Sequence, residues 1–107
     1  VAAVGEGSAL AFDPARFEAL AVGYHAGLGG GLTAAETDSL AVGPAVLSLE
    51  LAARFLADYL DGDRYFRTRF AGENLERCRG RLNLLQSMNR QERQIRHILA
   101  ETFGRRP

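Results

Sequence analysis

The apolar residues of this chain recur at helical spacing, and no segment alternates with period two for long enough to form a convincing strand. Apolar side chains three or four residues apart share one face of a helix. Residues 17–24, 75–85 and 95–103 each carry such a face. The pattern predicts an all-α fold, a small bundle of about four to five helices.

Residues typical of helix ends mark several boundaries. Asp13 followed by Pro14 predicts a helix start, because Asp caps first-turn amides and Pro fits the first helical position. The glycine-rich residues 27–31 are expected to end that helix. Thr33 and Glu36 have the spacing of a capping box, which predicts the start of a second helix.

The central segment is strongly apolar. Pro44 lacks an amide donor and clashes with the preceding turn, so we expect a break or kink there. A long buried helix is predicted over residues 45–60, apolar nearly all round except for Glu50, Arg54 and Asp58. These three stand four residues apart and share one face. One charged stripe on a buried helix indicates either an internal ion ladder or the wall of a polar cavity.

The remaining segments complete a single helical domain over residues 1–107. Residues 1–12 are small and glycine-rich and are expected to form a loose lead-in. Residues 65–70 predict a short irregular link, Asn74 is in position to cap the last helical region, and Ser87 is expected to interrupt or re-cap it. Because the chain opens without a methionine, we expect it to be a piece of a longer protein.

The formal net charge is zero, but the charge is unevenly distributed. Residues 1–63 hold nine acids against two arginines, residues 64–107 hold eleven arginines against four acids, and there is no lysine. We expect the basic half to pair with the acidic half or with parts of the protein outside this chain. A nucleic-acid partner is less favoured, since no motif that reads RNA or DNA accompanies the arginines.

Cysteine content and hydropathy favour a cytoplasmic protein. Cys78 is the only cysteine, which excludes an intrachain disulfide, and its setting is typical of a small buried residue. No uninterrupted apolar run approaches the roughly 18 to 20 residues of a membrane span, so we expect no membrane partner.

The sequence holds no complete catalytic set. Its glycine-rich segments lack the last glycine of a dinucleotide fingerprint, and without lysine there is no Walker or kinase lysine. His25 and His97 lie far apart in sequence, and we expect no metal site from them. Asp61 and Asp63 flank Gly62, a pattern that fits cation binding or acid-base work but is more typical of a turn.

Residues 54–66, RFLADYLDGDRYF, resemble the RFLxDYLxGDxYF signature of the N-acetylhexosamine kinases, in the aminoglycoside phosphotransferase and choline kinase-like group. The similarity covers roughly residues 9–103. Three more segments are similar to motifs of that family: residues 17–24 (FEALAVGY, for FEALxxGY), 32–36 (LTAAE, for LTxxE) and 74–79 (NLERCR, for NLxRAR, with Cys78 in place of Ala).

The resemblance implies the C-terminal helical part of a two-lobed sugar kinase. Such enzymes transfer the γ-phosphate of ATP, held by Mg²⁺, to the anomeric hydroxyl of an N-acetylhexosamine. The family's catalytic Asp, Mg²⁺ ligands and nucleotide lobe lie upstream, so this chain alone is expected to bind neither ATP nor Mg²⁺ and to be catalytically incomplete. Its implied partners are a small sugar and the N-terminal and catalytic parts of the same protein.

The resemblance also implies which residues contact the sugar. Arg54 and Tyr65 fall on positions that the family uses to bind it, and we place Asp58 in the same substrate site. The roles of Asp61 and Asp63 stay open. The family's further sugar-capping aromatic has no counterpart, since the chain lacks Trp.

Two alternatives remain. The guanidinium of Arg54 offers up to five donors for sugar hydroxyls or an N-acetyl carbonyl, with Tyr65 as an aromatic platform, but a structural Arg54–Asp58 ion pair also fits the spacing.

The whole chain also fits a non-enzymatic helical interaction module whose arginine-rich face docks onto a protein or nucleic acid. A lobe without its partner exposes apolar surface, so self-association is also expected.

Overall fold

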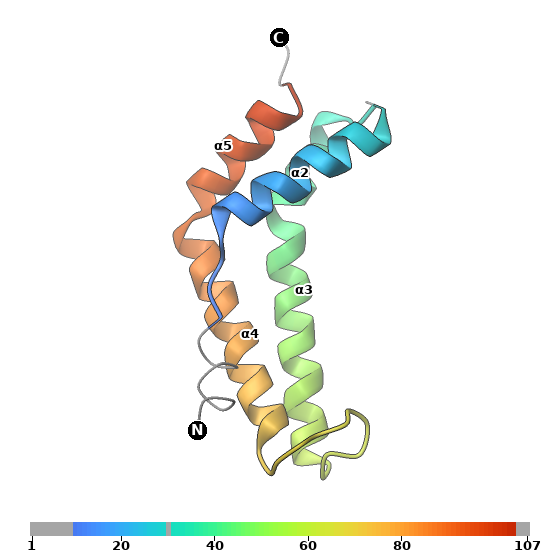
Figure 1. The fold of residues 1–107 in the computed structure, drawn as a ribbon, viewed down its shortest axis with the longest axis vertical. Helices are drawn as coiled ribbons and strands as arrows, with labels where there is room; N and C mark the ends of the chain where they lie inside the picture. The colour runs from blue at the N-terminus through green and yellow to red at the C-terminus, as the bar shows by residue number, and fades with distance from the viewer. Residues whose placement is uncertain (1–9, 30, 105–107) are drawn as a thin grey trace.

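The computed structural model describes residues 10–29 and 31–104, and every regular element in them is a helix (Figure 1). Helix α2 spans Pro14–Leu28, α3 spans Ala34–Leu60, α4 spans Glu73–Arg90 and α5 spans Glu92–Thr102. The predicted all-α bundle of about four to five helices is confirmed. Of the predicted lead-in, residues 1–9 lie outside the described residues and residues 10–12 are not helical.

Helix α2 begins and ends where the sequence predicts, and α3 begins where it predicts. Asp13 caps α2 by accepting an amide hydrogen bond, and Gly29 ends the helix in a left-handed conformation, at φ 72°. At the start of α3, Thr33 Oγ1 accepts from the amide of Glu36 at 3.1 Å, and Glu36 Oε1 accepts from the amide of Thr33 at 2.9 Å. The capping box is therefore formed by both partners.

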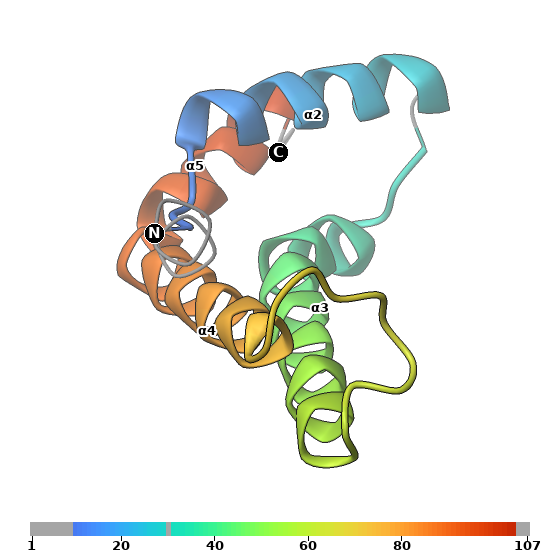
Figure 2. The same cartoon turned by 60° about the horizontal axis from the view of Figure 1, so that its bottom comes forward.

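Of the break or kink expected at Pro44, the break is wrong, because α3 continues through the proline as one helix. Figure 2 shows the first turns of α3 set at an angle to the rest, which is how a helix accommodates an internal proline. Ala41 and Ala45, on either side of the proline, pack in or against the apolar core. Their packing holds both parts of the helix in place and offsets the hydrogen bond that Pro44 cannot donate.

Because α3 is one continuous helix, it is long enough to be compared with a membrane-spanning segment. The helix has the length and composition of a membrane-spanning segment, with a mean hydropathy of 1.6 over its most apolar window. The expectation that no apolar stretch is long enough for a membrane span therefore does not hold for α3. A mostly buried core helix has the same length and hydropathy, but only 11% of this window is buried. The absence of a membrane partner and the cytoplasmic location both stay predictions.

The apolar core lies where α2, α5 and the first turns of α3 meet the end of α4 (Figure 1). Its buried residues are Ala21, Ala41, Met88, Ile95, Ile98 and Leu99. The predicted face of α2 is only partly buried, because Leu20 and Tyr24 are exposed and line an apolar hollow of about 270 Å³.

The predicted helix boundary at Ser87 is wrong by one turn. Ser87 is buried inside α4, which continues to Arg90, and Gln91 separates α4 from α5. The Ser87 hydroxyl accepts a hydrogen bond from the amide of Phe12 at 2.9 Å. The side chain therefore makes a tertiary contact instead of a local cap.

The second half of α3 packs lengthwise on α4 and gives the molecule an elongated shape of 52 × 23 × 21 Å (Figure 1). Only the side that faces α4 is buried, where Ser48 Oγ donates to the carbonyl of Arg81 at 2.8 Å and Ala52 packs beside it. The other sides are largely exposed. The prediction of a buried helix over residues 45–60 is therefore wrong within the described part of the chain.

Candidate functional site

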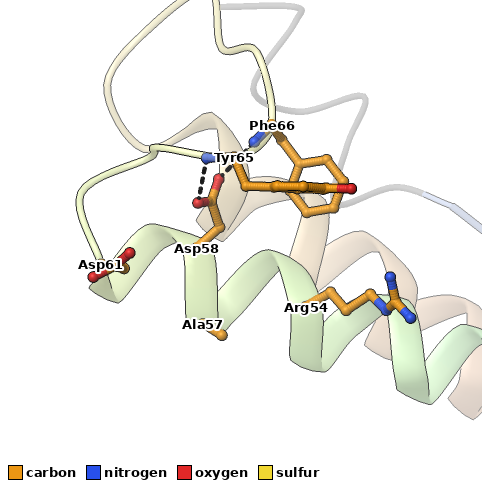
Figure 3. Close-up of a pocket in the computed structure, with 6 residues that line it drawn as sticks. All are labelled: Arg54, Ala57, Asp58, Asp61, Tyr65 and Phe66. Atoms are coloured by element: carbon orange, nitrogen blue, oxygen red, sulfur yellow. Dashed lines mark hydrogen bonds between the residues drawn. The ribbon is translucent and has the colours of Figure 1, made fainter.

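The carboxylate of Asp58 holds the loop between α3 and α4. Its Oδ1 accepts from the amides of Arg64 at 3.0 Å and Tyr65 at 2.8 Å. Its Oδ2 accepts from the amide of Phe66 at 3.0 Å and from Asn74 Nδ2 at 2.7 Å. Figure 3 shows the side chain of Asp58 pointing from the last turns of α3 toward the loop amides. Four donors thus converge on one buried carboxylate.

These hydrogen bonds decide the charge of Asp58. Burial by itself raises the pKa of the carboxyl, but the amides of Phe66, Tyr65 and Arg64 and the side chain of Asn74 together outweigh it and hold the pKa below its ordinary value. Asp58 is therefore ionised at neutral pH. Because both oxygens are bonded, it serves to hold the loop, a task that the sequence did not predict.

Asn74 is fully buried, with 0% of its surface exposed. Its Nδ2 also donates to Asp63 Oδ1 at 3.0 Å, and its Oδ1 accepts from Arg77 Nη1 at 2.9 Å. The prediction that Asn74 caps α4 is wrong, because Gly72 is the N-cap and Asn74 lies inside the helix. Asp63 has a left-handed backbone, at φ 60°, and belongs to the turn that its neighbours fix.

Glu73 fixes the other end of the loop. It accepts hydrogen bonds from the amide, Nε and Nη2 of Arg69 at 2.6 to 3.0 Å, and it lies 3.3 Å from Arg77 Nη2. The hydrogen bonds from Arg69 outweigh burial and lower the pKa of Glu73. Arg77 Nη2 donates to the carbonyl of Arg67 at 3.0 Å, and its guanidinium lies over the ring of Phe55.

The roles of Glu73, Asn74 and Arg77 in organising the loop were not predicted from the sequence. A signal for them exists, because positions 73, 74 and 77 lie on one face of a helix that directly follows the loop. We call these three residues, together with Asp58, the polar clamp.

A hollow of about 380 Å³ lies between the last turns of α3 and the clamped loop (Figure 3). The side chain of Tyr65 extends from the loop toward the turn that carries Arg54, and its ring packs edge-on against Phe66 with centroids 4.8 Å apart. Tyr65 is 79% exposed. The lining residues are Arg54, Ala57, Asp58, Asp61, Tyr65 and Phe66. The three predicted substrate residues therefore border one hollow.

The predicted charged stripe divides in two. Each step of four residues turns the helix by about 40° beyond a full turn, so Glu50 and Asp58 end up about 80° apart. Asp58 thus meets the loop and α4, whereas Glu50 and Arg54 lie at the surface as an ion pair of 3.0 Å. Among the described residues, Arg54 forms no ion pair with Asp58, and the side chain of Arg54 is 59% exposed. The structural alternative of an Arg54–Asp58 pair is therefore wrong.

Arg54 also lies in a different setting from the one predicted. It is not surrounded by hydrocarbon, and its guanidinium lies at the edge of the hollow. Among the residues that the structure describes, Glu50 is its one acidic neighbour within 4.0 Å. Asp61 borders the same hollow, and its exposed carboxylate lies 4.0 Å from Arg64. The hollow therefore offers donors, an acceptor and an aromatic face to a polar ligand.

The described residues contain no group of three or more His, Cys, Asp or Glu placed to hold a metal ion. The expectation that this chain alone binds neither ATP nor Mg²⁺ stays a prediction. Cys78 is buried, as predicted, and burial raises the pKa of its thiol.

No protein-family profile matches this sequence, and no solved structure matches this fold. The resemblance to N-acetylhexosamine kinases therefore rests on the motif residues alone. The two motifs at residues 54–66 and 74–79 are the segments that the hydrogen bonds of Asp58 and Asn74 join. The resemblance and the clamp thus concern the same residues.

Proposed function

We propose that this chain forms one wall of the sugar site in an N-acetylhexosamine kinase-type phosphotransferase. Arg54 donates hydrogen bonds to sugar hydroxyls or to the N-acetyl carbonyl. Tyr65 supplies the aromatic surface against which the ring lies, and Asp61 accepts from a hydroxyl. Asp58 contributes by holding the loop that carries Tyr65. ATP, Mg²⁺ and the catalytic Asp belong in this proposal to other parts of the protein.

One observation carries the proposal: Arg54 and Tyr65, eleven positions apart, border the same hollow while the backbone of Tyr65 is fixed by a buried carboxylate. Sugar sites combine charge-assisted hydrogen bonds with an aromatic face, and they gain affinity when these groups are held in place before the ligand arrives. The motif that resembles the kinase signature supplies both groups.

The first test is to read the gene upstream of Val1 and assay the whole encoded protein. A sugar kinase requires an HxDxxxxN-like catalytic loop and an Asp metal ligand there. We expect ATP-dependent phosphorylation of an N-acetylhexosamine. An unrelated upstream domain, or no upstream sequence, contradicts the proposal.

The second test asks whether Arg54 and Tyr65 contact the sugar. In the whole protein, we expect Arg54→Ala to lower kcat/KM for the sugar by the equivalent of about 1.5 to 3 kcal/mol, the contribution of a charged hydrogen bond. Tyr65→Ala should raise the KM for the sugar, whereas Tyr65→Phe should not. Arg79→Ala and Tyr24→Ala serve as matched controls, because both residues are exposed and neither borders the hollow. Unchanged kinetics in Arg54→Ala would remove the role of Arg54.

A second candidate is the non-enzymatic helical interaction module. It is favoured by the exposed apolar side of α3, on which several large residues have no helix packed against them in the described part of the chain. The upstream reading frame separates the two candidates, since the module needs no catalytic loop.

A further inference from the structure

Six residues of α3 form a continuous stripe on the side turned away from α4, and we call it the apolar seam. All six are exposed. Among the described helices, α3 contacts only α4 and α5, and Figures 1 and 2 show no helix along this side. The residues of the apolar seam are Val42, Val46, Leu49, Ala53, Leu56 and Leu60.

The spacing of the apolar seam is regular. From Val42 to Leu60 the steps are four, three, four, three and four residues, which is the heptad repeat of a coiled coil. A repeat of 3.5 residues keeps a stripe facing one straight partner helix, with a crossing angle near 20°. The pattern therefore indicates a single helix, packed lengthwise, as the partner.

We propose that this partner is α3 of a second copy of the chain, packed antiparallel about a twofold axis near the middle of the apolar seam. In this register Val46 faces Leu56 of the other copy along the straight part of α3. Val42 lies before the angle at Pro44, at the edge of the contact and nearest to Leu60 of the other copy. At the centre Leu49 faces Ala53. Each pair sets a larger side chain against a smaller one, so the seam is complementary to itself, as a twofold interface requires.

The charges at the two ends of α3 favour the antiparallel arrangement. The first turns carry Glu36 and Asp38, both exposed. The loop after the helix is basic by one charge, with three arginines against two aspartates (Arg64, Arg67 and Arg69; Asp61 and Asp63). Antiparallel packing brings the acidic end of one copy to the basic loop of the other, and it also opposes the two helix dipoles. Parallel packing would place the four acids side by side.

The size of the apolar seam sets the strength of the dimer. It is about 27 Å long and about 10 Å wide, from the helical rise and diameter. Such a strip is smaller than the roughly 800 Å² that each partner buries in a standard interface, so association is reversible and depends on concentration. The residues that line the hollow lie outside the seam, and the dimer does not depend on the proposed sugar site.

Two leucines provide a matched test. Leu49 in the seam and Leu47 outside it are 53% and 56% exposed, and they point to different sides of α3. Sedimentation of the full chain over a range of concentrations should show a monomer–dimer equilibrium. Leu49→Glu should raise the dissociation constant at least tenfold, whereas Leu47→Glu should leave it within about twofold. Circular dichroism checks that both variants remain helical.

Disulfide cross-linking tests the register without disturbing the apolar character of the seam. When Leu49→Cys and Ala53→Cys proteins are mixed and oxidised, the antiparallel register gives mainly cross-links between the two variants. A parallel dimer would instead link Leu49→Cys to itself. Cys78 is buried in each protein, and peptide mapping identifies the bond that forms.

Three results would overturn the proposal. The first is a chain that stays monomeric at all concentrations, and the second is equal weakening by Leu47→Glu and Leu49→Glu. The third is a monomer that co-sediments with phosphatidylcholine vesicles and loses this property in Leu49→Glu, because the seam would then face lipid. A loss of sugar phosphorylation has no bearing on these readouts.

Discussion

At the end of the molecule where α2 meets α5, apolar side chains such as Ile95 and Leu99 are packed against one another. At the opposite end the buried polar side chains are the amide of Asn74 and three carboxylates, those of Asp58, Glu73 and Glu76. Apolar burial is non-directional and contributes stability in proportion to area. Hydrogen bonds fix atoms at defined distances and angles, and their net contribution to stability is small. The apolar end therefore supplies most of the stability, and the polar clamp supplies the geometry of the loop.

The largest effect is expected from truncating the apolar end. Ile95 is 3% exposed, so Ile95→Ala removes buried methyl groups and leaves a cavity, at a cost of about 2 to 5 kcal/mol in the free energy of unfolding. Leu20→Ala is the control on α2, because Leu20 is 73% exposed, and its cost should stay below about 0.5 kcal/mol. Urea unfolding measures both. Equal losses in the two variants would contradict the proposed location of the core.

A smaller but more local effect is expected from Asn74→Ala. The change removes three hydrogen bonds: Asp58 keeps its three amide donors but loses the fourth, and Asp63 and Arg77 each lose a partner. The expected cost is about 1 to 3 kcal/mol. Amide hydrogen exchange at Arg64 and Tyr65 should accelerate while exchange in α5 does not. Asn89→Ala, on the exposed side of the same helix, is the control. If amides in the loop and in α5 lost protection equally, the polar clamp and the apolar core would not respond separately to the change.

Acid should also separate the two ends. Asp58 and Glu73 both have a pKa held below the ordinary value in the folded chain, so the stability that they contribute is fully present above their ordinary values of 3.8 and 4.5. That stability is lost as pH falls through the lowered folded pKa values. We expect the urea midpoint to decline below about pH 4, with loop amides losing protection before those of α5.

The control for this pH dependence is a pair of variants. Asp58→Asn and Glu73→Gln should each be less stable at neutral pH, and each should show a shallower decline in acid because one titrating group is gone. Asp61→Asn, at an exposed carboxylate, should leave the decline unchanged. If the urea midpoint falls with pH in the same way in all variants, the loss of stability in acid comes from other carboxylates.

The smallest effect is expected at Arg54. Its ion pair with Glu50 is exposed on both sides, and such pairs contribute about 0 to 1 kcal/mol. Arg54→Ala should therefore leave the melting temperature nearly unchanged, and Glu50→Ala should behave in the same way. A large loss of stability in Arg54→Ala would mean that the arginine is part of the scaffold and not a residue reserved for a ligand.

The sequence indicated the candidate site with partial success. Arg54, Asp58 and Tyr65 were all expected in one site, and all three border the same hollow. Their different roles could not be predicted, because they depend on which backbone amides donate hydrogen bonds to Asp58 once the loop has folded back. Asn74 looks like a helix cap in sequence, yet its partner Asp58 lies sixteen positions earlier.

The sequence alone determined the helical class, the capping box at Thr33 and the end of α2 at Gly29. These features depend on contacts within about four residues, which the order of amino acids specifies directly. Only the tertiary structure decided that α3 runs through Pro44, that one side of it stays exposed and that Asp58 holds a loop. Each of these outcomes depends on groups brought together from distant positions, where packing and burial outweigh local preference.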